Sequence, residues 1–595
     1  MFSPSTSTAA PVAAPLVAAS EARGRRLAEI LFFGLLLLAG VLLVNDYGVS
    51  WDEPNNHLNG LVNLKYLASL LPVGEGLRHH PTFVATPDIR DFPDAHHGPL
   101  FEMAAVVVSY ALTDHDSRSY FLVRHTMVFG VFAVGVWALY QLGRRWLADW
   151  RWGLLAAALL VASPRFFAEA FYNGKDIVYM ACFTLAMHTL LRLLERPTAG
   201  RALVHGLAVA LAVDIRVQGL QLLLFTALGL GLTAWFEVPE PGAARPAYGR
   251  LGLLSAVAAL AGIVAGWPYL WAHSLSELLA VSSHAVHYPW PFTNFYLGQF
   301  LTVQQLPWHY IPVWMLVTIP LPYSLGATVG LLSAAALALR RGGRATLAAP
   351  AGRTVVLVAA WLLAPVLVVI GTHAVVYESW RHLYFIYPAL LLWATYGARA
   401  LLRWSRKPAA SQGRLVARLA LALALFETGH TVVRQVQMHP HGNVYFSFLP
   451  GSVAERLFER DYWGLSFRQG LEWITTHDAA PTLTVNTFWH YPLYNNSLII
   501  QPDARTRLQY VHTPAARYYL TNYRWHPQSY RDSLGAEVYV IRAGGLKVLS
   551  VFRRAKVAAP PARLPETEVP SRVRHLRQPN SPTESPPVLV SPFSQ

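Results

Sequence analysis

The residues of this chain best suited to chemistry are an acidic pair, Asp52 and Glu53, just after the first long apolar segment, Leu27 to Val44. A carboxylate at membrane depth costs roughly 2.5–3.5 kcal/mol if it faces lipid, so such groups usually face a polar cavity or a functional site. Adjacent side chains diverge by about 100° on a helix and 180° on a strand. One carboxylate can therefore act on a substrate while the other positions it. The alternative is a pair that ends the apolar helix, although helix C-termini favour cations.

Basic residues beside later apolar runs could bind an anion. Arg124, Arg216 and Arg381 each lie within or at the end of such a run, and Lys175-Asp176 occupies a turn between two runs. Arg can hold a phosphate by two parallel hydrogen bonds. The set therefore predicts an anionic ligand such as a phosphate. For each arginine alone, snorkelling toward lipid headgroups is an equal alternative, and Asp176 could serve only as a helix cap.

A stretch rich in His and Asp could in principle coordinate a divalent metal. Its members are His79, His80, Asp88, Asp91, Asp94, His96 and His97. Their spacing matches no compact ligand motif, so we expect a loop that folds over the site. The one cysteine, Cys182, excludes an internal disulfide and lies in an apolar run, which predicts a packing role.

The composition predicts a polytopic membrane protein. Of the 595 residues, 54% are hydrophobic and 14% are charged, whereas soluble domains carry about 25% charged residues. The mean hydropathy is +0.32. A formal charge of +15 would suggest nucleic acid in a soluble chain. Because the basic residues cluster in short loops between apolar runs, membrane topology explains them better, and we expect no nucleic-acid partner.

The apolar runs predict about eleven crossings of a bilayer, each needing about 17–25 residues. They lie near 27–44, 119–142, 153–170, 176–194, 202–217, 219–236, 251–271, 310–338, 354–372, 384–402 and 414–433. A shorter stretch, Pro99 to Leu112, decides the topology. If it does not cross, all arginine-rich loops are cytoplasmic, as the positive-inside bias favours. The N-terminus is then cytoplasmic, and the C-terminus and the acidic pair are extracytoplasmic.

The sequence divides into four predicted parts. They are a cytoplasmic segment 1–26, a transmembrane domain 27–436, an extracytoplasmic α/β domain 437–557 and a disordered tail 558–595 rich in Pro, Ser and Arg. The external loop 45–118 should contain interfacial helices, one of them from His57 to Leu71. In the outer domain, the patterns predict a helix at 466–477 and strands at 482–485, 497–500, 517–520 and 537–540.

Taken together, these segments resemble the GT-C class of integral-membrane glycosyltransferases, and within it the protein O-mannosyltransferase and aminoarabinose-transferase-like group (bacterial glycosyltransferase family 39-like). Its most specific mark is an Asp-Glu pair after the first transmembrane helix, which Asp52-Glu53 matches. Supporting matches are His96-His97-Gly98-Pro99-Leu100, Arg124 at the opening of the next helix, Lys175-Asp176, Arg381-His382-Leu383-Tyr384, and His439 to Phe446 followed by Asp461-Tyr462-Trp463-Gly464. The resemblance covers roughly residues 27–475. Gly98 stands where a second proline is usual.

The resemblance implies an all-α polytopic membrane protein with the GT-C fold and a small α/β extracytoplasmic domain. It also implies an inverting transfer of a hexosyl or pentosyl group from a polyprenyl-phosphate donor to a glycan, lipid or protein acceptor, outside the plasma (inner) membrane. Cations would stabilise the phosphate leaving group, and a base would activate the acceptor hydroxyl.

The implied roles fall on ten residues. Asp52 would be the base, and Glu53 would orient it or bind the acceptor. The donor phosphate would be bound by Arg381, His382, Arg124, Lys175 and Arg216. Asp176, His97 and Tyr384 would support the site.

Related oligosaccharyltransferases hold a divalent metal with several acids, whereas only Asp176 stands at the matching turn of this chain. We therefore expect a metal-independent mechanism without another cofactor, and a divalent cation is the alternative. Two other functions stay open: a transporter or flippase of lipid-linked sugar, and a non-catalytic subunit that recruits the acceptor. Transporters usually show duplicated halves and helices broken near the midplane, which this sequence does not show.

Overall fold

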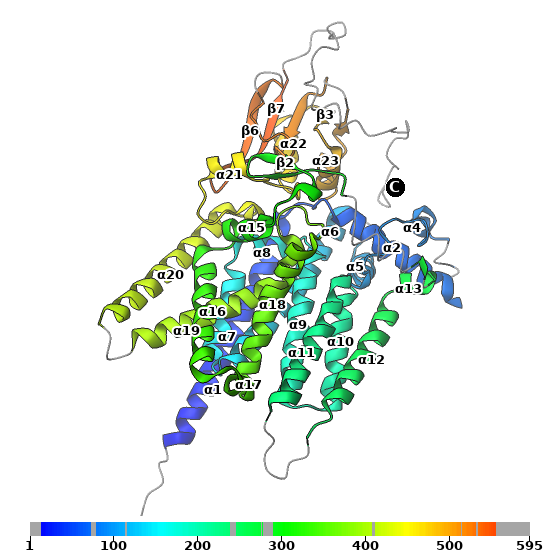
Figure 1. The fold of residues 1–595 in the computed structure, drawn as a ribbon. Helices are drawn as coiled ribbons and strands as arrows, with labels where there is room; N and C mark the ends of the chain where they lie inside the picture. The colour runs from blue at the N-terminus through cyan, green and yellow to red at the C-terminus, as the bar shows by residue number, and fades with distance from the viewer. Residues whose placement is uncertain are drawn as a thin grey trace, which may run out of the picture.

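The computed structural model describes residues 13–554 apart from 73–75, 77–78, 114–115, 238–244, 275, 278–289, 407–410, 513–514 and 531–533. The predicted disordered tail 558–595 lies outside the described residues. Most of the described chain forms a bundle of helices, and a small sheet lies at one end of the bundle (Figure 1). This is the predicted fold class: a polytopic helical membrane protein with a small C-terminal α/β region.

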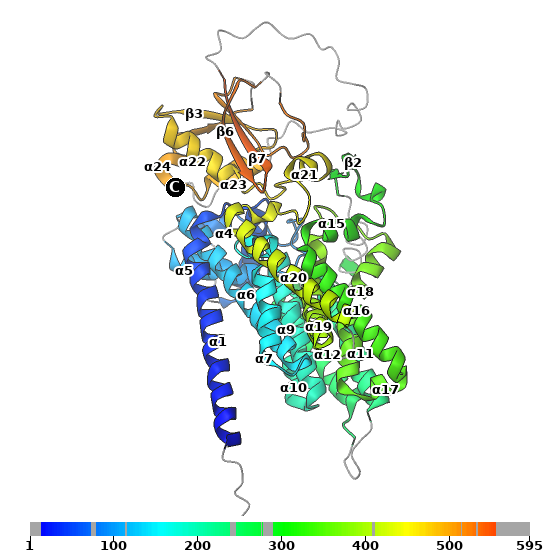
Figure 2. The same cartoon turned by 90° about the vertical axis from the view of Figure 1, so that its left-hand side faces the viewer.

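Nine helices in the described part of the chain are long and apolar enough to cross a membrane. They lie in α1 (Ala13–Leu43), α6 (Ser117–Trp146), α9 (Asp176–Glu195), α11 (Gln221–Phe236), α12 (Tyr248–Gly266), α16 (Leu321–Arg341), α18 (Pro350–Thr372), α19 (Tyr387–Ser405) and α20 (Ser411–Met438). Figure 2 shows α1 along the outside of the bundle.

Two of the eleven predicted crossings are shorter than expected. Helix α7 (Trp150–Val161) has 12 residues and α10 (Ala199–Val213) has 15, which at 1.5 Å per residue gives roughly 18 and 23 Å. Helix α7 stops before Pro164, which lacks a backbone N–H and begins a separate short helix, α8 (Pro164–Glu169). Of the eleven predicted crossings, nine are thus long helices in the described part of the chain, and the two at α7 and α10 are shorter apolar helices.

Helix α5 (Leu100–Leu112), the stretch that decides the topology, stays near the sheet end of the bundle. Glu102, near its start, pairs with Arg124, and Tyr110, near its end, packs on Tyr120. Both partners lie in the first turns of α6, so α5 does not run along the length of the bundle. The predicted helix 57–71 is present as α2 (Glu53–Leu70), which packs against α5.

The arginine-rich connections lie at the opposite end of the bundle. Arg145 near the end of α6 pairs with Glu195 at the end of α9 (2.6 Å), and Arg399 of α19 donates to the carbonyl of Leu147 (2.6 Å). Both views place the α6–α7, α9–α10 and α16–α18 connections away from the sheet (Figures 1 and 2). These arginine-rich connections are thus gathered at one end of the bundle, the arrangement on which the predicted topology depends.

The C-terminal region contains a five-stranded sheet with the order β4-β3-β5-β7-β6. Its strands are β3 (Leu483–Asn486), β4 (Leu508–Tyr510), β5 (Tyr518–Thr521), β6 (Ala536–Ala543) and β7 (Leu546–Arg553). Strand β3 is parallel to β4 and β5, and β7 is antiparallel to β5 and β6. Helix α22 (Phe467–His477), which the sequence predicted, packs on this sheet.

The predicted strand at 497–500 is wrong. Ser497 ends helix α23 (His490–Ser497), and the carbonyls of Leu498 and Ile499 accept hydrogen bonds from Ser117 and Arg118 of α6. Because this apolar run is buried against the helical bundle, its backbone is not available to the sheet.

The remaining described elements are short connections. They are η1 (Val44–Asp46), α4 (Pro81–Ala85), η3 (Val217–Leu220), α13 (Tyr269–Ala272), β1 (Asn294–Tyr296), β2 (Gln299–Leu301), η4 (Val303–Gln305), α15 (Tyr310–Thr318), α17 (Gly343–Ala348), η5 (Arg381–Ile386), η6 (Gly442–Val444), α21 (Gly451–Leu457) and α24 (Pro502–Arg505).

Candidate active site

The acidic pair begins α2 rather than ending α1. Asp52 is the residue before the helix and Glu53 is its first residue, where the helix dipole favours anions. Pro54 lies in the first turn, where a missing N–H costs nothing. The Asp52 carboxylate makes no capping hydrogen bond. It is therefore available for partners outside the helix.

The two carboxylates diverge, as adjacent positions predict. Glu53 is fully buried; it accepts a hydrogen bond from the backbone N–H of Ser50 (2.6 Å) and lies 2.9 Å from Nε2 of His125 and 3.5 Å from Nε of Arg124. These contacts fix the loop that precedes α2. Since no part of Glu53 is exposed, the geometry favours its orienting role over contact with an acceptor.

Asp52 meets Arg381, which lies 329 positions later in the chain. Arg381 Nη1 donates to Asp52 Oδ2 at 2.8 Å and lies 3.6 Å from Asp176 Oδ2, and its Nη2 lies 2.8 Å from Glu378 Oε2. The Arg381 side chain is 4% exposed and that of Asp52 is 30% exposed. Asp52 is therefore the most exposed of these carboxylates and the one that an incoming acceptor can reach.

Asp176 adds a second arginine to the charged cluster formed by Asp52, Asp176, Glu378 and Arg381. It is the first residue of α9, and its Oδ1 pairs with Nη2 of Arg216, at the start of η3. The N-terminus of α9 is capped by Asn173, whose Oδ1 accepts the Asp176 N–H (2.8 Å). Capping thus comes from Asn173, and the Asp176 carboxylate binds Arg216 and Arg381.

Lys175 supplies a cation without a direct partner. In the described part of the chain its ammonium group makes no hydrogen bond or ion pair, although the charges of Asp52, Asp94 and Asp176 all act on it. Burial and the nearby Arg216 lower the pKa of Lys175 to about 8. An anion that enters beside Asp52 could therefore pair directly with this ammonium group.

The pKa of Asp52 reflects the same balance of charges. Burial raises the pKa, but the nearby Arg381, Lys175 and Arg216 lower it more, so it stays below the usual value of an aspartate. Asp52 is therefore ionised at neutral pH and can accept a proton. A base paired so closely with a guanidinium is weak, and an anion that drew Arg381 and Lys175 toward itself would strengthen it.

The other predicted site residues lie around this cluster. His382 packs edge-on against Tyr377 (4.5 Å between ring centroids), and its Nδ1 is buried without a hydrogen-bond partner among the described residues. His97 lies close enough to Lys175 that burial and this charge hold its pKa well below the usual value. Tyr384 donates to Glu169 (2.8 Å), which also accepts from Asn173 (2.7 Å), the residue that caps α9 beside Asp176.

Gly98 sits where the related pattern has a proline, and its contacts explain the small residue. A Cβ atom there would lie 2.4 Å from the carbonyl oxygen of Asp214, which also accepts the N–H of Leu100. The 88–99 loop therefore packs directly on the backbone two residues before Arg216.

Arg124 has other partners than the predicted phosphate. It is fully buried, and its two terminal nitrogens bind the Glu102 carboxylate at 2.5 and 3.0 Å. Together with the contact to Glu53, these bonds hold α5 and α2 against α6. Because Arg124 is fully buried and contacts Glu102 and Glu53 rather than the charged groups around Asp52, we leave Arg124 out of the proposed phosphate site.

Three charged residues of the cluster carry no clear signal in the sequence. Glu378 lies three residues before Arg381, and Arg524 and Glu459 belong to the C-terminal region. Arg524 binds Glu378 Oε1 through Nη2 and Glu459 Oε1 through Nε (2.9 Å). Glu378 could have been found because it lies three residues before Arg381. Arg524 and Glu459 could not, because charged residues are common in a water-exposed domain and give no functional signal.

The His- and Asp-rich stretch does not gather into a ligand set. Among the described residues no group of three or more His, Cys, Asp or Glu side chains could hold a metal. Asp88 pairs with Lys65 (3.0 Å), Asp94 accepts from Asn55 (2.6 Å), and His96 contacts the carbonyl of Pro93 (2.8 Å). The metal-independent mechanism remains a prediction.

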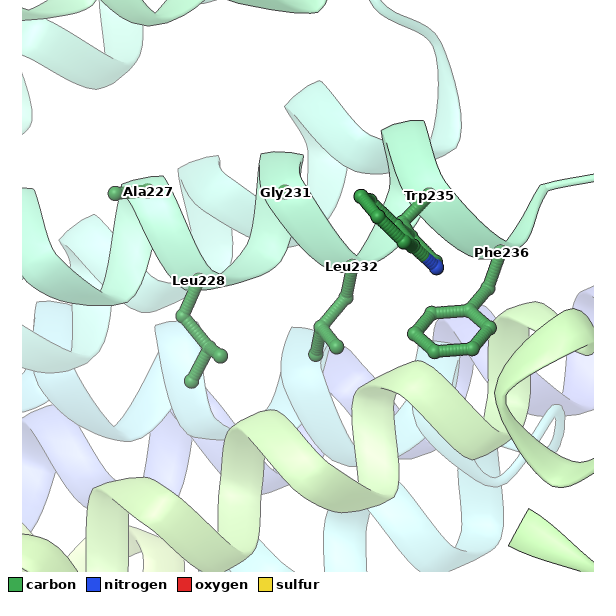
Figure 3. Close-up of a pocket in the computed structure, with 6 residues that line it drawn as sticks. All are labelled: Ala227, Leu228, Gly231, Leu232, Trp235 and Phe236. Carbon is green, nitrogen blue, oxygen red and sulfur yellow. The ribbon is translucent and has the colours of Figure 1, made fainter. Parts of the chain in front are cut away.

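A hollow of about 430 Å³ lies on the second half of α11, between residues 227 and 236 (Figure 3). It is lined by Ala227, Leu228, Gly231, Leu232, Trp235 and Phe236. None of these side chains is ionisable, so none can act as an acid or base or pair with an anion. We interpret the hollow as lipid-facing surface, and the charged residues around Asp52 remain the candidate active site.

No family model matches the chain, and no curated protein matches it. Solved structures with a similar fold include the apo oligosaccharyltransferase of Archaeoglobus fulgidus (13% identity, TM-score 0.45, covering 80% of this chain and 63% of that chain). They also include ArnT from Cupriavidus metallidurans, bound to undecaprenyl phosphate (13%, 0.44, 89% and 98%) and in the apo state (12%, 0.47, 88% and 98%).

These structures belong to the GT-C glycosyltransferases, the class that the sequence motifs resemble. This chain spans less than two thirds of the oligosaccharyltransferase chain. At such identities and with TM-scores below 0.5, the likeness does not transfer a function to this chain. The proposal below therefore rests on the geometry of its own site.

Proposed function

We propose that this chain is an inverting glycosyltransferase that moves a sugar from a polyprenyl-phosphate donor to an acceptor on the extracytoplasmic face of the membrane. One observation carries the proposal: the partly exposed Asp52 carboxylate lies 2.8 Å from the buried Arg381 guanidinium, with Lys175 and Arg216 beside it. A base and a set of cations thus meet at one end of a helical membrane bundle. Transfer from a lipid phosphate requires both.

The cations define the donor side. Lys175, Arg216, Arg381 and the buried Nδ1 of His382 can surround a phosphate. A polyprenyl chain attached to that phosphate would extend along the apolar surface of the bundle. In our proposal no metal is needed, because these side chains supply the positive charge that stabilises the departing phosphate.

Asp52 acts on the acceptor side. It removes the proton from an acceptor hydroxyl while the hydroxyl oxygen bonds to the anomeric carbon of the donor sugar. The bond from that carbon to the phosphate oxygen breaks, and its electron pair stays on the polyprenyl phosphate. Because the acceptor and the leaving phosphate occupy opposite faces of the sugar, the configuration inverts.

The acceptor could be a glycan, a lipid or a protein. Beside Asp52, Trp51 is half-buried, with its ring 5.6 Å from Tyr491 and 6.1 Å from Trp525 of the C-terminal domain. These aromatic rings form a rigid surface next to the base, against which an acceptor can pack.

The test is a transfer assay with the purified full chain in lipid nanodiscs and undecaprenyl-phosphate sugars. We expect release of undecaprenyl phosphate, and a loss of about 10²–10⁴-fold in the Asp52→Asn variant, the usual contribution of a general base. The matched control is Asp46→Asn, because Asp46 lies on the same loop but pairs with His439 (2.7 Å). Equal rates for wild type and Asp52→Asn would contradict the proposal.

The same variants separate the alternative functions. A flippase should move lipid-linked sugar across proteoliposome membranes whether residue 52 is Asp or Asn. A recruiting subunit should release no undecaprenyl phosphate by itself. Mass spectrometry of the lipid-linked intermediates that accumulate in a deletion strain would identify the sugar.

A further inference from the structure

Arg524 connects the C-terminal domain to the charged cluster. It lies just after β5, and its side chain is 5% exposed. Its Nη2 binds Glu378, its Nε donates to Glu459 (2.9 Å), and its Nη1 donates to the carbonyl of Tyr462 (2.9 Å). Each of the three guanidinium nitrogens thus has a hydrogen-bond partner, and the side chain is almost completely buried.

Glu378 is shared between two arginines. Its Oε1 accepts from Arg524, and its Oε2 lies 2.8 Å from Nη2 of Arg381. Arg381 in turn binds Asp52. An unbroken series of ion pairs therefore runs from Glu459 and Arg524 to the proposed base.

The backbone around the Glu378–Arg524 ion pair is strained. Glu378 and Ser379 have φ angles of 54° and 72°, and Tyr523 and Trp525, on either side of Arg524, both have φ of 60°. These are four of the seven non-glycine residues with positive φ in the described part of the chain. Such strain persists where the surrounding structure enforces it and clusters at functional sites.

The strained loops are held by specific bonds. The N–H of Glu378 donates to Asn294 Oδ1 (2.9 Å), and the N–H of Ser379 donates to the hydroxyl of Tyr310 (3.1 Å). The Arg524 guanidinium also lies over the rings of Trp525 and Trp51, at 4.2 and 5.1 Å from their centroids. Both partners of the pair are thus fixed from several directions.

The balance of charge explains what Arg524 does. Without it, Arg381 would be the one remaining ion-pair partner of the Glu378 carboxylate among the described residues, and Glu459 would lose its ion pair with Arg524. A carboxylate that claims Arg381 competes with any anionic ligand for the same guanidinium. With Arg524 present, part of that negative charge is neutralised from the C-terminal side.

We propose that Arg524 is a positioning residue that neutralises Glu378 and so keeps Arg381 available to the phosphate of the donor. The inference rests on the proposed function, because it assumes that Arg381 binds a phosphate. It gives the C-terminal domain a role in donor binding through charge. Arg524 itself does not touch the donor.

The experiment measures the Kd of undecaprenyl phosphate for the full chain in nanodiscs. We expect Arg524→Gln to weaken binding by about tenfold or more, as the loss of one partner of a buried charge pair does. Glu378→Gln removes the competing charge and should bind as wild type does or more tightly. The double variant restores the original sum of charges and should return to within about threefold of wild type.

The rescue separates positioning from a loss of fold. The matched control is Arg460→Gln, because Arg460 is a buried arginine of the same domain that forms no ion pair among the described residues. Its guanidinium donates to the carbonyls of Lys547, Pro527 and Glu455 and lies over the ring of Tyr523. This control should lower thermal stability and leave the Kd unchanged. A double variant as weak as Arg524→Gln would overturn the inference, and so would an Arg524→Gln variant that binds like wild type.

Wild-type binding distinguishes the two proposals. A wild-type chain that does not bind undecaprenyl phosphate contradicts the proposed function and the inference together. A wild-type chain that binds it, alongside an unaffected Arg524→Gln variant, contradicts the inference alone.

Discussion

At the scale of single residues, two adjacent carboxylates have different surroundings because their side chains leave the backbone in different directions. Asp52 is partly exposed and bound to one guanidinium, whereas Glu53 is buried among Ser50, His125 and Arg124. The first is suited to meet a substrate. The second is suited to hold the first in place.

This difference predicts opposite effects of two similar substitutions. Glu53→Gln breaks a buried ion pair with Arg124, which typically costs about 3–5 kcal/mol of folding stability. We expect its melting temperature to fall well below that of wild type, whereas Asp52→Asn should melt near the wild-type temperature with its transfer activity lost. Thermal unfolding and undecaprenyl phosphate release, measured on both variants, check this. The assignment of roles is wrong if the two variants show the reverse pattern.

Lys175 predicts an alkaline limit to phosphate binding. Its pKa is lowered to about 8 by burial and by Arg216, so the ammonium form dominates below pH 8 and is lost as the pH rises above it. Above pH 7 a phosphate monoester has completed its second ionisation, whose pKa is about 6. Affinity for undecaprenyl phosphate should therefore fall by up to about tenfold between pH 7 and 9.

The Lys175→Arg variant is the matched test of this limit, because arginine stays charged throughout that range. Its Kd should be flat between pH 7 and 9. The same alkaline fall in Lys175→Arg would show that another group causes it.

At the scale of elements, the position of α5 decides which residues share a face of the membrane. With 13 residues, it spans roughly 20 Å, less than the hydrocarbon core of about 30 Å. Its contacts with Arg124 and Tyr120 keep both ends near the sheet end of the bundle. The acidic pair and Lys175-Asp176 can then lie on one side.

Thiol labelling in intact cells tests this topology in a Cys182→Ala background. We expect Asp91→Cys, before α5, and Thr113→Cys, after it, to react with an impermeant reagent from outside. Ala148→Cys, beyond α6, should react only after permeabilisation. If Thr113→Cys also needs permeabilisation while Asp91→Cys does not, α5 crosses the membrane and the predicted topology fails.

At the scale of the whole molecule, the C-terminal domain fixes the loop of the bundle that precedes Asp52. Asn496 of α23 accepts the Val49 N–H (3.1 Å) and donates to the carbonyls of Val49, Gly464 and Pro492. The N–H of Trp51 donates to the carbonyl of Trp463 (3.0 Å). The loop that carries Asp52 is therefore held by the domain that also supplies Arg524.

Asn496→Ala should loosen this loop. Each of its buried hydrogen bonds contributes about 1 kcal/mol, and their loss frees the backbone just before Asp52. We expect roughly tenfold slower transfer with little change in the Kd of undecaprenyl phosphate, because a small displacement of the base affects turnover more than donor binding. Ser497→Ala is the control, because this hydroxyl bonds within its own helix to Tyr494 (2.6 Å). Equal transfer rates for the two variants would contradict the role of Asn496.

Much of the fold follows from local pattern. Long apolar runs with few charges form membrane helices because unpaired backbone groups are not tolerated in lipid, and period-two patterns gave β3, β5 and β6. The pattern failed where tertiary contacts decide. The run 497–500 has strand composition, but its carbonyls bind Ser117 and Arg118, and α7 ends where Pro164 begins a new helix.

The sequence alone determined that Asp52, Asp176, Arg216 and Arg381 lie beside apolar runs. Because exposing any one of these charges to lipid is costly, each of them separately predicts a polar site. Only the tertiary structure decided which of these charges meet. Arg124 forms an ion pair with Glu102, and Arg381 forms one with Glu378, which also pairs with Arg524. Arg381 and Asp52 lie 329 positions apart and Arg524 and Glu378 lie 146 apart, so the choice of partner depends on distances in space that no local pattern encodes.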